Sequence, residues 1–376
     1  MDEYIFLTGI ALFTMLLTLV IQILTLNLTR KNVFLGVRIP EENSEDPELK
    51  ELGKKFVKSN ILIGVPAAAA LSMFVYLCKS LVLFMCVVFG YIFILFLIYY
   101  SFNKKVKAIK TKNFWLNTKK QEVIIDTSFS REKRKYSMPS SWWFLLPLII
   151  IAINLIINFN YYPSLPDRVA THWDINGHVN GWQNKSALII YEMPLFQLFM
   201  TTVLFFSYKG IGWAKQEISS INPEESKERN RIFRRAWSIY FILSTIGINL
   251  IFTLGNLEIM QVTHMDSKLS MALILAFAGA MIISSLVLSI KVGQGGSRLK
   301  LNKGESQKAI FHRDDDKYWL LANSIYYNPE DPSLFVEKRF GIGWTINAGT
   351  AAGKAIYVFT VLLVIFTFVI VIFSKS

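Results

Sequence analysis

The sequence predicts an all-α membrane protein, a polytopic bundle of about eight transmembrane helices with a small extracytoplasmic hairpin-like loop. Of its 376 residues, 53% are hydrophobic and 14% aromatic, a composition typical of chains that cross a bilayer repeatedly. Eight apolar runs approach or reach the roughly 20 residues that span a hydrocarbon core about 30 Å thick. Because lipid offers no partners to backbone polar groups, these runs are expected to form helices.

The loop charges predict which way these spans cross the membrane. The loops after the first, third, fifth and seventh spans carry 35 of the 40 lysine and arginine residues. Basic loops stay on the cytoplasmic side, so both termini are predicted to be extracytoplasmic. The expected spans are Tyr4–Leu28, Ser59–Cys78, Leu81–Tyr100, Trp142–Asn158, Leu188–Ser207, Ala236–Gly255, Leu269–Ile290 and Ala355–Phe373.

The net charge of +13 has the same origin as this bias. Basic residues this close to a membrane favour lipid headgroups over nucleic acid, so membrane lipids are expected partners and nucleic acid is not. The chain divides along its length into a three-span segment (1–140), a two-span unit with the polar outer loop (141–210), spans six and seven (211–290), and a cytoplasmic segment with the last span (291–376).

A short amphipathic helix is expected before the second span. Asp46 and Pro47 are typical of a helix start, and Leu49, Leu52 and Phe56 follow at helical spacing. It is expected to lie at the inner surface and run into the span, either contacting lipid or a partner or serving as a plain connector. In the basic loop after the third span, residues 123–125 are expected to form a short strand.

A polar island at residues 161–186 interrupts two apolar runs. It holds two of the four histidines and two of the nine tryptophans of the chain. A two-residue turn at Asn176–Gly177 would pair Trp173 with Asn180 and place the two histidines on opposite faces. A metal site is therefore not expected, and neither is a cofactor. The ligand-recognition candidates in this loop are His172, Trp173, Asp174, His178 and Trp182.

The spacing of Leu165–Pro166, His172, Asn176–Gly177, Gly181–Trp182 and Lys185 resembles a signature of bacterial membrane proteins related to the SdpI-type bacteriocin-immunity family. The run at residues 32–40 is similar to another family motif, with Ile39 where the family has Thr. It supplies the candidate cytoplasmic motif Asn32, Gly36, Arg38 and Pro40. Residues 326–345 resemble an extension found in some relatives. The resemblance implies a multi-span protein of the bacterial cytoplasmic membrane in an immunity or signalling class. Most of these relatives have no known function, and the best-known members protect cells from a secreted toxic peptide.

Polar residues also occur within the predicted spans. If Asn154, Asn158, Glu192, Gln197 and Asn249 converge, they would line an outward-open polar cleft beneath the outer loop. Scattered hydrogen bonds between helices explain them equally well. The shallow Glu192 either snorkels to the outer interface or acts functionally, with Arg168 or Lys185 as candidate partners.

The long loop before the last span is expected to begin with a flexible stretch at Gly293–Ser297. The acidic triplet Asp314–Asp316 is expected to cap a helix or, less economically, to bind a cation.

Known catalytic motifs do not occur in the sequence, so the chain is not expected to be an enzyme. The leading hypothesis is a recognition, immunity or signalling protein that binds an extracellular peptide and a cytoplasmic protein partner. The alternative is a small-solute or ion transporter that uses Glu192 and the polar helix positions. A membrane-embedded enzyme is a third hypothesis and requires His172, Asp174 and Glu192 to cluster.

Overall fold

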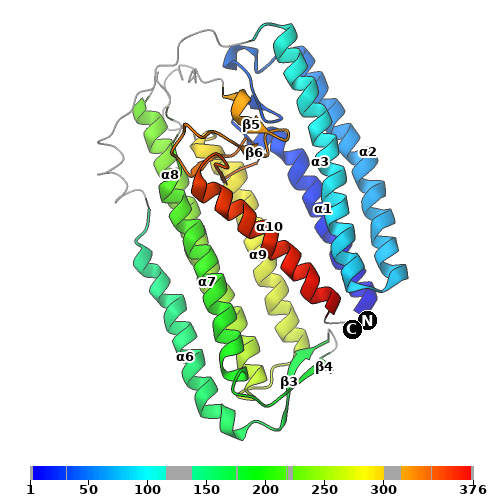
Figure 1. Ribbon diagram of the computed structural model, residues 1–376, viewed down its shortest axis with the longest axis vertical. Helices are drawn as coiled ribbons and strands as arrows, with labels where there is room; N and C mark the ends of the chain where they lie inside the picture. The colour runs from blue at the N-terminus through cyan, green and yellow to red at the C-terminus, as the bar shows by residue number, and fades with distance from the viewer. Residues whose placement is uncertain are drawn as a thin grey trace. The chain divides into compact units, whose positions relative to one another are not determined.

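The computed structural model describes residues 3–30, 32–115, 138–174, 177–216, 218, 223–299, 315–339 and 341–373 (Figure 1). The chain forms two compact units. The first comprises residues 127–212 and 231–288, and the second comprises residues 2–126, 213–230 and 289–376. Contacts thus join the two ends of the chain in the second unit, whereas the four segments expected above follow sequence order.

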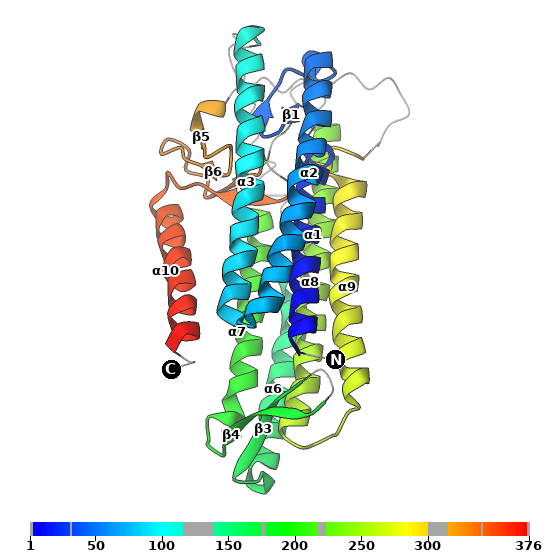
Figure 2. The same ribbon diagram turned by 90° about the vertical axis from the view of Figure 1, so that its right-hand side faces the viewer.

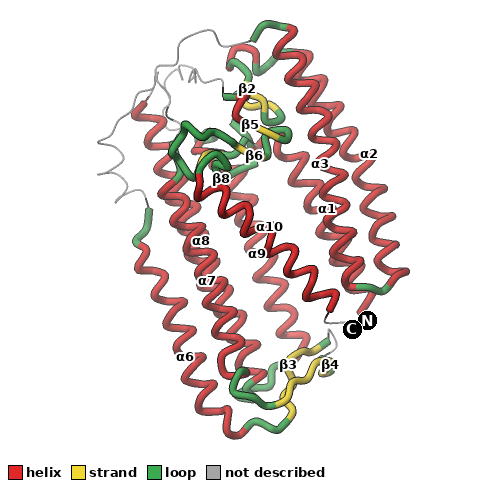
Figure 3. Tube along the Cα trace, viewed as in Figure 1, coloured by secondary structure: helices red, strands yellow, loops and turns green. Residues whose placement is uncertain are grey.

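The fold class predicted from the sequence is confirmed. Among the described residues, seven helices are long and apolar enough to cross a membrane. The eighth expected span corresponds to α10 (Ala351–Phe373), which is 23 residues long. The short strands among the described residues belong to two-stranded hairpins, shown in yellow in Figure 3. The strand expected at residues 123–125 lies outside the described residues.

The first unit is built from long helices that carry one hairpin at an end. The hairpin consists of β3 (Arg168–Trp173) and β4 (Val179–Asn184), and it connects the end of α6 to the beginning of α7 (Figure 2). The helices are α6 (Leu145–Tyr161), α7 (Ile189–Trp213), α8 (Pro223–Ile259), whose first turns belong to the second unit, and α9 (Ser267–Val292).

The second unit has a core in which α1 (Glu3–Leu28), α2 (Pro47–Cys78) and α3 (Leu81–Lys112) pack against one another. Besides α10, the described part of this unit contains three small hairpins. They are formed by β1 (Val33–Phe34) with β2 (Val37–Arg38), β5 (Trp319–Leu320) with β6 (Ile325–Tyr326), and β7 (Phe335–Glu337) with β8 (Trp344–Ile346).

The expected start of α2 is confirmed, but its surface location is wrong. The Asp46 carboxylate accepts a hydrogen bond from the Glu48 amide at 2.8 Å, and Pro47 opens the helix. The helix then continues without a break to Cys78. Leu49 and Phe56 are fully buried in the core of the second unit. The apolar face of this segment therefore packs inside the protein and does not lie on the membrane surface.

Candidate functional site

The hairpin of the first unit is anchored on its inner face and at its base. Leu165 and Val169 are buried against Ile189, Ile259 and Met260, at the adjoining ends of α7 and α8. At the base, the Lys185 ammonium donates to the carbonyl oxygens of Pro163 and Leu165, at 2.9 and 2.7 Å. A two-stranded ribbon alone is marginally stable, so these contacts to the helix ends hold it in place.

The expected register of this hairpin is wrong by one residue near the turn. Trp173 pairs with Val179, and register shifts lie on either side of His172. The Asp174 amide donates to the His178 carbonyl, and the Gly177 amide donates to the Asp174 carbonyl. Three residues therefore lie between Asp174 and His178, which a backbone hydrogen bond joins, where a two-residue turn was expected. Gly177 has a φ of +84°, the left-handed conformation that such three-residue loops place at this position.

The five candidates on the hairpin divide between an outer and an inner surface. Trp182 is 53% exposed, with the Arg168 guanidinium 5.9 Å from its ring centre. His172 is also exposed, and its Nδ1 contacts Asn180 Oδ1. The side chain of His178 is 81% exposed and lies 3.5 Å from the Asp174 carboxylate, while Trp173 packs against the buried cluster. The exposed set is therefore Arg168, His172, His178 and Trp182.

Glu192 is bound to the hairpin, and not by either of the expected cations. Its Oε1 accepts a hydrogen bond from Gln183 Nε2 at 2.7 Å. Lys185 is engaged with backbone carbonyls and Arg168 with the Trp182 ring. Glu192 thus links the start of α7 to β4.

The polar residues within the helices of this unit converge but do not line an open cleft. Asn158 and Asn256 exchange reciprocal amide hydrogen bonds at 3.0 and 2.8 Å, and both are fully buried. Deeper in the unit, Asn154 donates to Gln197 Oε1 at 2.9 Å, and Asn249 donates to the Thr201 hydroxyl at 2.9 Å. These side chains form a closed polar seam between α6, α7 and α8, which matches the alternative of interhelical hydrogen bonds.

The candidate cytoplasmic motif forms the β1–β2 hairpin of the second unit. Leu35 and Gly36 both have positive φ, +44° and +81°, so they turn the chain tightly. A Cβ on Gly36 would lie 2.5 Å from the Tyr99 hydroxyl and 2.7 Å from Asn323 Nδ2, so only glycine fits. The Asn32 carbonyl oxygen accepts from the Ile39 amide and closes this hairpin, and the Pro40 carbonyl oxygen accepts from the Asn43 amide in the 3₁₀ turn that follows.

Arg38 of this motif belongs to a buried network of charges. Arg339 binds both Asp315 and Asp316 through its two terminal nitrogens, and it donates to the Gly36 carbonyl at 3.2 Å. Arg38 Nε lies 3.4 Å from Asp315. Lys110 of α3 donates to Asp316 at 2.7 Å. One guanidinium thereby ties the two aspartates to the β1–β2 turn.

The same contacts explain the charge state of these carboxylates. Burial tends to raise the pKa of Asp316, but the positive charges of Arg339 and Lys110 outweigh it and lower the pKa below the ordinary 3.8. Burial also tends to raise the pKa of Asp331, and hydrogen bonds from Lys215 and Ser333 lower it overall. Both groups are therefore held as carboxylates.

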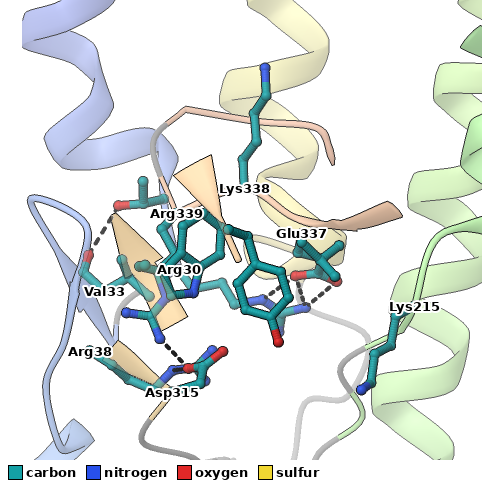
Figure 4. A pocket seen from close by; sticks show the side chains of 12 residues that line it. Arg30, Val33, Arg38, Lys215, Asp315, Glu337, Lys338 and Arg339 are labelled. Atoms are coloured by element: carbon teal, nitrogen blue, oxygen red, sulfur yellow. Dashed lines mark hydrogen bonds and ion pairs between the residues drawn. The ribbon is translucent and has the colours of Figure 1, made fainter. Parts of the chain in front are cut away.

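The buried ion pairs and a small cavity that charged groups surround form one charged site in this unit (Figure 4). Arg30 binds Glu337 through two nitrogens, each 2.9 Å from a carboxylate oxygen. The cavity provides about 20 Å³ for the centre of a water-sized sphere, enough for one small guest. The lining residues are Thr29, Arg30, Val33, Arg38, Lys215, Asp315, Trp319, Tyr326, Val336, Glu337, Lys338 and Arg339.

Two expectations about the long loop are corrected by this arrangement. Asp315 and Asp316 neutralise buried cations, and neither capping nor cation binding accounts for them; Asp314 lies outside the described residues. The stretch at Gly293–Ser297 forms a 3₁₀ turn, in which Gln294 is buried and exchanges two hydrogen bonds with Gly343. The sequence analysis singled out Arg38, Asp315 and Asp316 but did not bring them together with Arg30, Glu337 and Arg339.

Comparisons with known proteins agree with this picture at a coarse level. Residues 149–198, from α6 through the hairpin into α7, match a family model described as a domain of unknown function, DUF1648. Together with the seven long apolar helices, this makes the chain an integral membrane protein. Residues 329–354 match a family of unknown function, DUF5808, and include Asp331, Glu337 and Arg339 of the charged site. No curated protein matches the chain, and no solved structure matches it.

Proposed function

We propose that the chain is a non-enzymatic recognition protein of the bacterial cytoplasmic membrane, in the immunity or signalling class. Its β3–β4 hairpin binds an extracellular peptide, and its cytoplasmic loops contact a cytoplasmic protein. The observation that carries the proposal is the hairpin itself, which is held firmly on one side while a tryptophan, an arginine and two histidines remain exposed on the other.

The exposed residues suit the recognition of a peptide. Tryptophan and arginine are enriched at the centres of binding interfaces, where tryptophan provides a large rigid contact area and arginine provides several hydrogen-bond donors. Here the Arg168 guanidinium already lies over the Trp182 ring, so both groups are partly ordered before a ligand arrives. Pre-ordering reduces the entropy lost on binding.

The charge distribution along α8 supports an outer position for the hairpin. Arg231, Arg234 and Arg235 lie near the start of this helix, whereas Ile259 and Met260, which contact the hairpin, lie at its other end. A helix of 37 residues is about 55 Å long. With the basic end in the cytoplasm, the hairpin falls on the opposite side.

The alternative of a small-solute or ion transporter receives less support. Transport through the first unit would require the buried amides to line a path. They are fully buried and bonded to one another across the helices, an arrangement that suits a structural seam.

The test is a challenge of cells that produce the chain with a panel of secreted membrane-active peptides. We expect Trp182→Ala and Arg168→Ala to reduce protection and to weaken direct binding of the protective peptide at least tenfold. Trp143→Ala is the matched control, because Trp143 is 54% exposed and belongs to the same unit but lies outside the hairpin. Equal protection by all three variants, or none from the native chain, would end the proposal.

A further inference from the structure

The helices α2 and α3 lie side by side and are longer than a bilayer is thick, so one end of the pair projects from it (Figure 1). Each helix has 32 residues and is about 48 Å long, against a hydrocarbon core of about 30 Å. Residues 59–78 of α2 and 81–103 of α3 carry no formal charge, and Lys58 and Lys104 adjoin these runs on the projecting side. The bilayer boundary therefore falls close to these two lysines.

The packing of the two helices brings three lysines to this boundary. Phe56 of α2 packs edge-on against Phe102 of α3, with the ring centres 5.4 Å apart. Lys58 lies within one turn of the first ring, and Lys104 and Lys105 lie within one turn of the second. All three side chains are exposed, and none has a carboxylate partner among the described residues. We call Lys58, Lys104 and Lys105 the boundary lysines.

The two boundary lysines of α3 bend toward the bilayer. Lys104 Nζ lies 4.6 Å from the centre of the Tyr100 ring, and Lys105 Nζ lies 4.6 Å from the centre of the Phe102 ring. Both rings precede the lysines in α3 and therefore lie on the bilayer side of them. A lysine at the edge of a bilayer usually extends away from the apolar core to reach water. The opposite direction here places both ammonium groups at the depth of lipid headgroups.

The surroundings of the boundary lysines match an anionic phospholipid. The carboxylates of Glu48 and Glu51 lie about 10 Å or more from Lys58 along α2, and each is engaged in an ion pair with another lysine. On the bilayer side, Leu62 is 61% exposed and Leu97 is 48% exposed. A surface with exposed cations next to exposed apolar side chains suits a phosphate group joined to acyl chains, whereas a soluble anion would use the cations alone.

We infer that the boundary lysines form a binding site for the headgroup of an anionic phospholipid. The lipid phosphate accepts hydrogen bonds from their ammonium groups, and its acyl chains cover Leu62 and Leu97. One lysine near an anionic membrane surface strengthens binding by about fivefold. The site is independent of the peptide recognition proposed for the first unit, because all of its residues belong to the second. Either proposal can therefore fail without the other.

The experiment measures which lipid lies next to α3 in vesicles of equal parts phosphatidylglycerol and phosphatidylcholine. In the full-length chain with Cys78→Ser and Cys86→Ser, Leu97→Cys carries a bimane fluorophore. A nitroxide on the acyl chains of one lipid or the other then quenches the fluorophore in proportion to the local amount of that lipid. We expect phosphatidylglycerol to be in local excess by about fivefold or more.

The double variant Lys58→Gln, Lys105→Gln removes one boundary lysine from each helix and should reduce this excess to about half or less. The matched control is Lys50→Gln, Lys112→Gln, which also removes one cation from each helix. Both control lysines are paired with glutamates and lie about 10 Å further from the bilayer, roughly one screening length at physiological salt. The control should therefore keep the excess.

Equal quenching by the two lipids in the chain that keeps all its lysines overturns the inference, and so does an equal loss in the two double variants. Loss of the excess on addition of soluble glycerol phosphate at constant ionic strength also overturns it, because the site would then take a free anion. Melting temperatures in detergent check that each variant folds. If a variant does not fold, the comparison of the two lipids next to the labelled chain with all its lysines decides.

Discussion

Replacing Arg339 by alanine should destabilise the second unit more than any comparable change of charge near it. The side chain of Arg339 is 3% exposed and serves two carboxylates and a backbone carbonyl simultaneously. Its removal leaves Asp315 with Arg38 at 3.4 Å and Asp316 with Lys110 at 2.7 Å. Each carboxylate keeps one cation, but two buried negative charges lose their shared partner.

The magnitude follows from the cost of breaking buried ion pairs. Removing one partner of such a pair costs about 3–5 kcal/mol. We expect a loss of about 3 kcal/mol for Arg339→Ala, at the lower end of that range, because one cation remains beside each aspartate. A loss of that size lowers the ratio of folded to unfolded protein by roughly 100-fold, a large share of the 5–15 kcal/mol typical of folded domains.

Hydrogen exchange by mass spectrometry is the appropriate assay, because it reports each segment separately. Protection should fall in β1–β2 and in residues 315–339, while the described part of α7 that lies in the first unit serves as the internal reference. Arg339→Lys should be intermediate, since an ammonium cannot bridge both carboxylates in the same way. Lys338→Ala is the matched control, an exposed cation one position earlier. If its effect equals that of Arg339→Ala, the reasoning about the buried network is wrong.

Three further predictions concern the turn, the seam and pH. Gly36→Ala should cost about 1–3 kcal/mol, because alanine is strained at a φ of +81°, whereas Gly9→Ala in α1 has open space and should cost nothing; thermal melts measure both. Asn158→Leu should cost about 1–2 kcal/mol by leaving Asn256 unpaired, and changing both residues to leucine should restore part of that loss in the same melts. The lowered pKa of Asp331 means that its carboxyl binds protons more weakly when folded. The contribution of this carboxylate to folding stability should be complete above the ordinary pKa of 3.8 and disappear as pH falls through the pKa of the folded protein. Asp331→Asn should therefore reduce the fall in melting temperature at acid pH.

The helices were predictable because each is encoded by a continuous stretch of chain. Length and hydropathy locate a span without knowledge of its neighbours. The start of α2 was predictable for a similar reason, since Asp46 and Pro47 act within one turn. What the local pattern could not supply was the environment of Leu49 and Phe56. An apolar face at helical spacing is the same whether it packs on lipid or on protein.

The hairpin of the first unit was predictable in existence but not in register. The polar island and its Asn-Gly pair indicate a turn. The length of the turn, however, depends on where the inner residues pack. Val169 is fully buried against the helix ends, and this contact helps to fix the register.

The charged site could not be predicted because its parts are distant in sequence and locally unremarkable. Arg30 and Glu337 are separated by 307 positions. The strands that carry Arg38 and Trp319 are two residues long, too short to show an alternating pattern. Charged residues in loops usually face solvent, so the aspartates beside Arg313 resembled a helix cap.

The sidedness of the hairpin tests the central claim most directly. In a chain with Cys78→Ser and Cys86→Ser, a single cysteine is introduced either at Asn184, an exposed position of β4, or at Glu51, an exposed position of α2. Intact cells are then treated with a membrane-impermeant maleimide. The account predicts that Asn184→Cys reacts at once and that Glu51→Cys reacts only after the cells are permeabilised. Reaction of Glu51→Cys in intact cells, with Asn184→Cys protected, would contradict it.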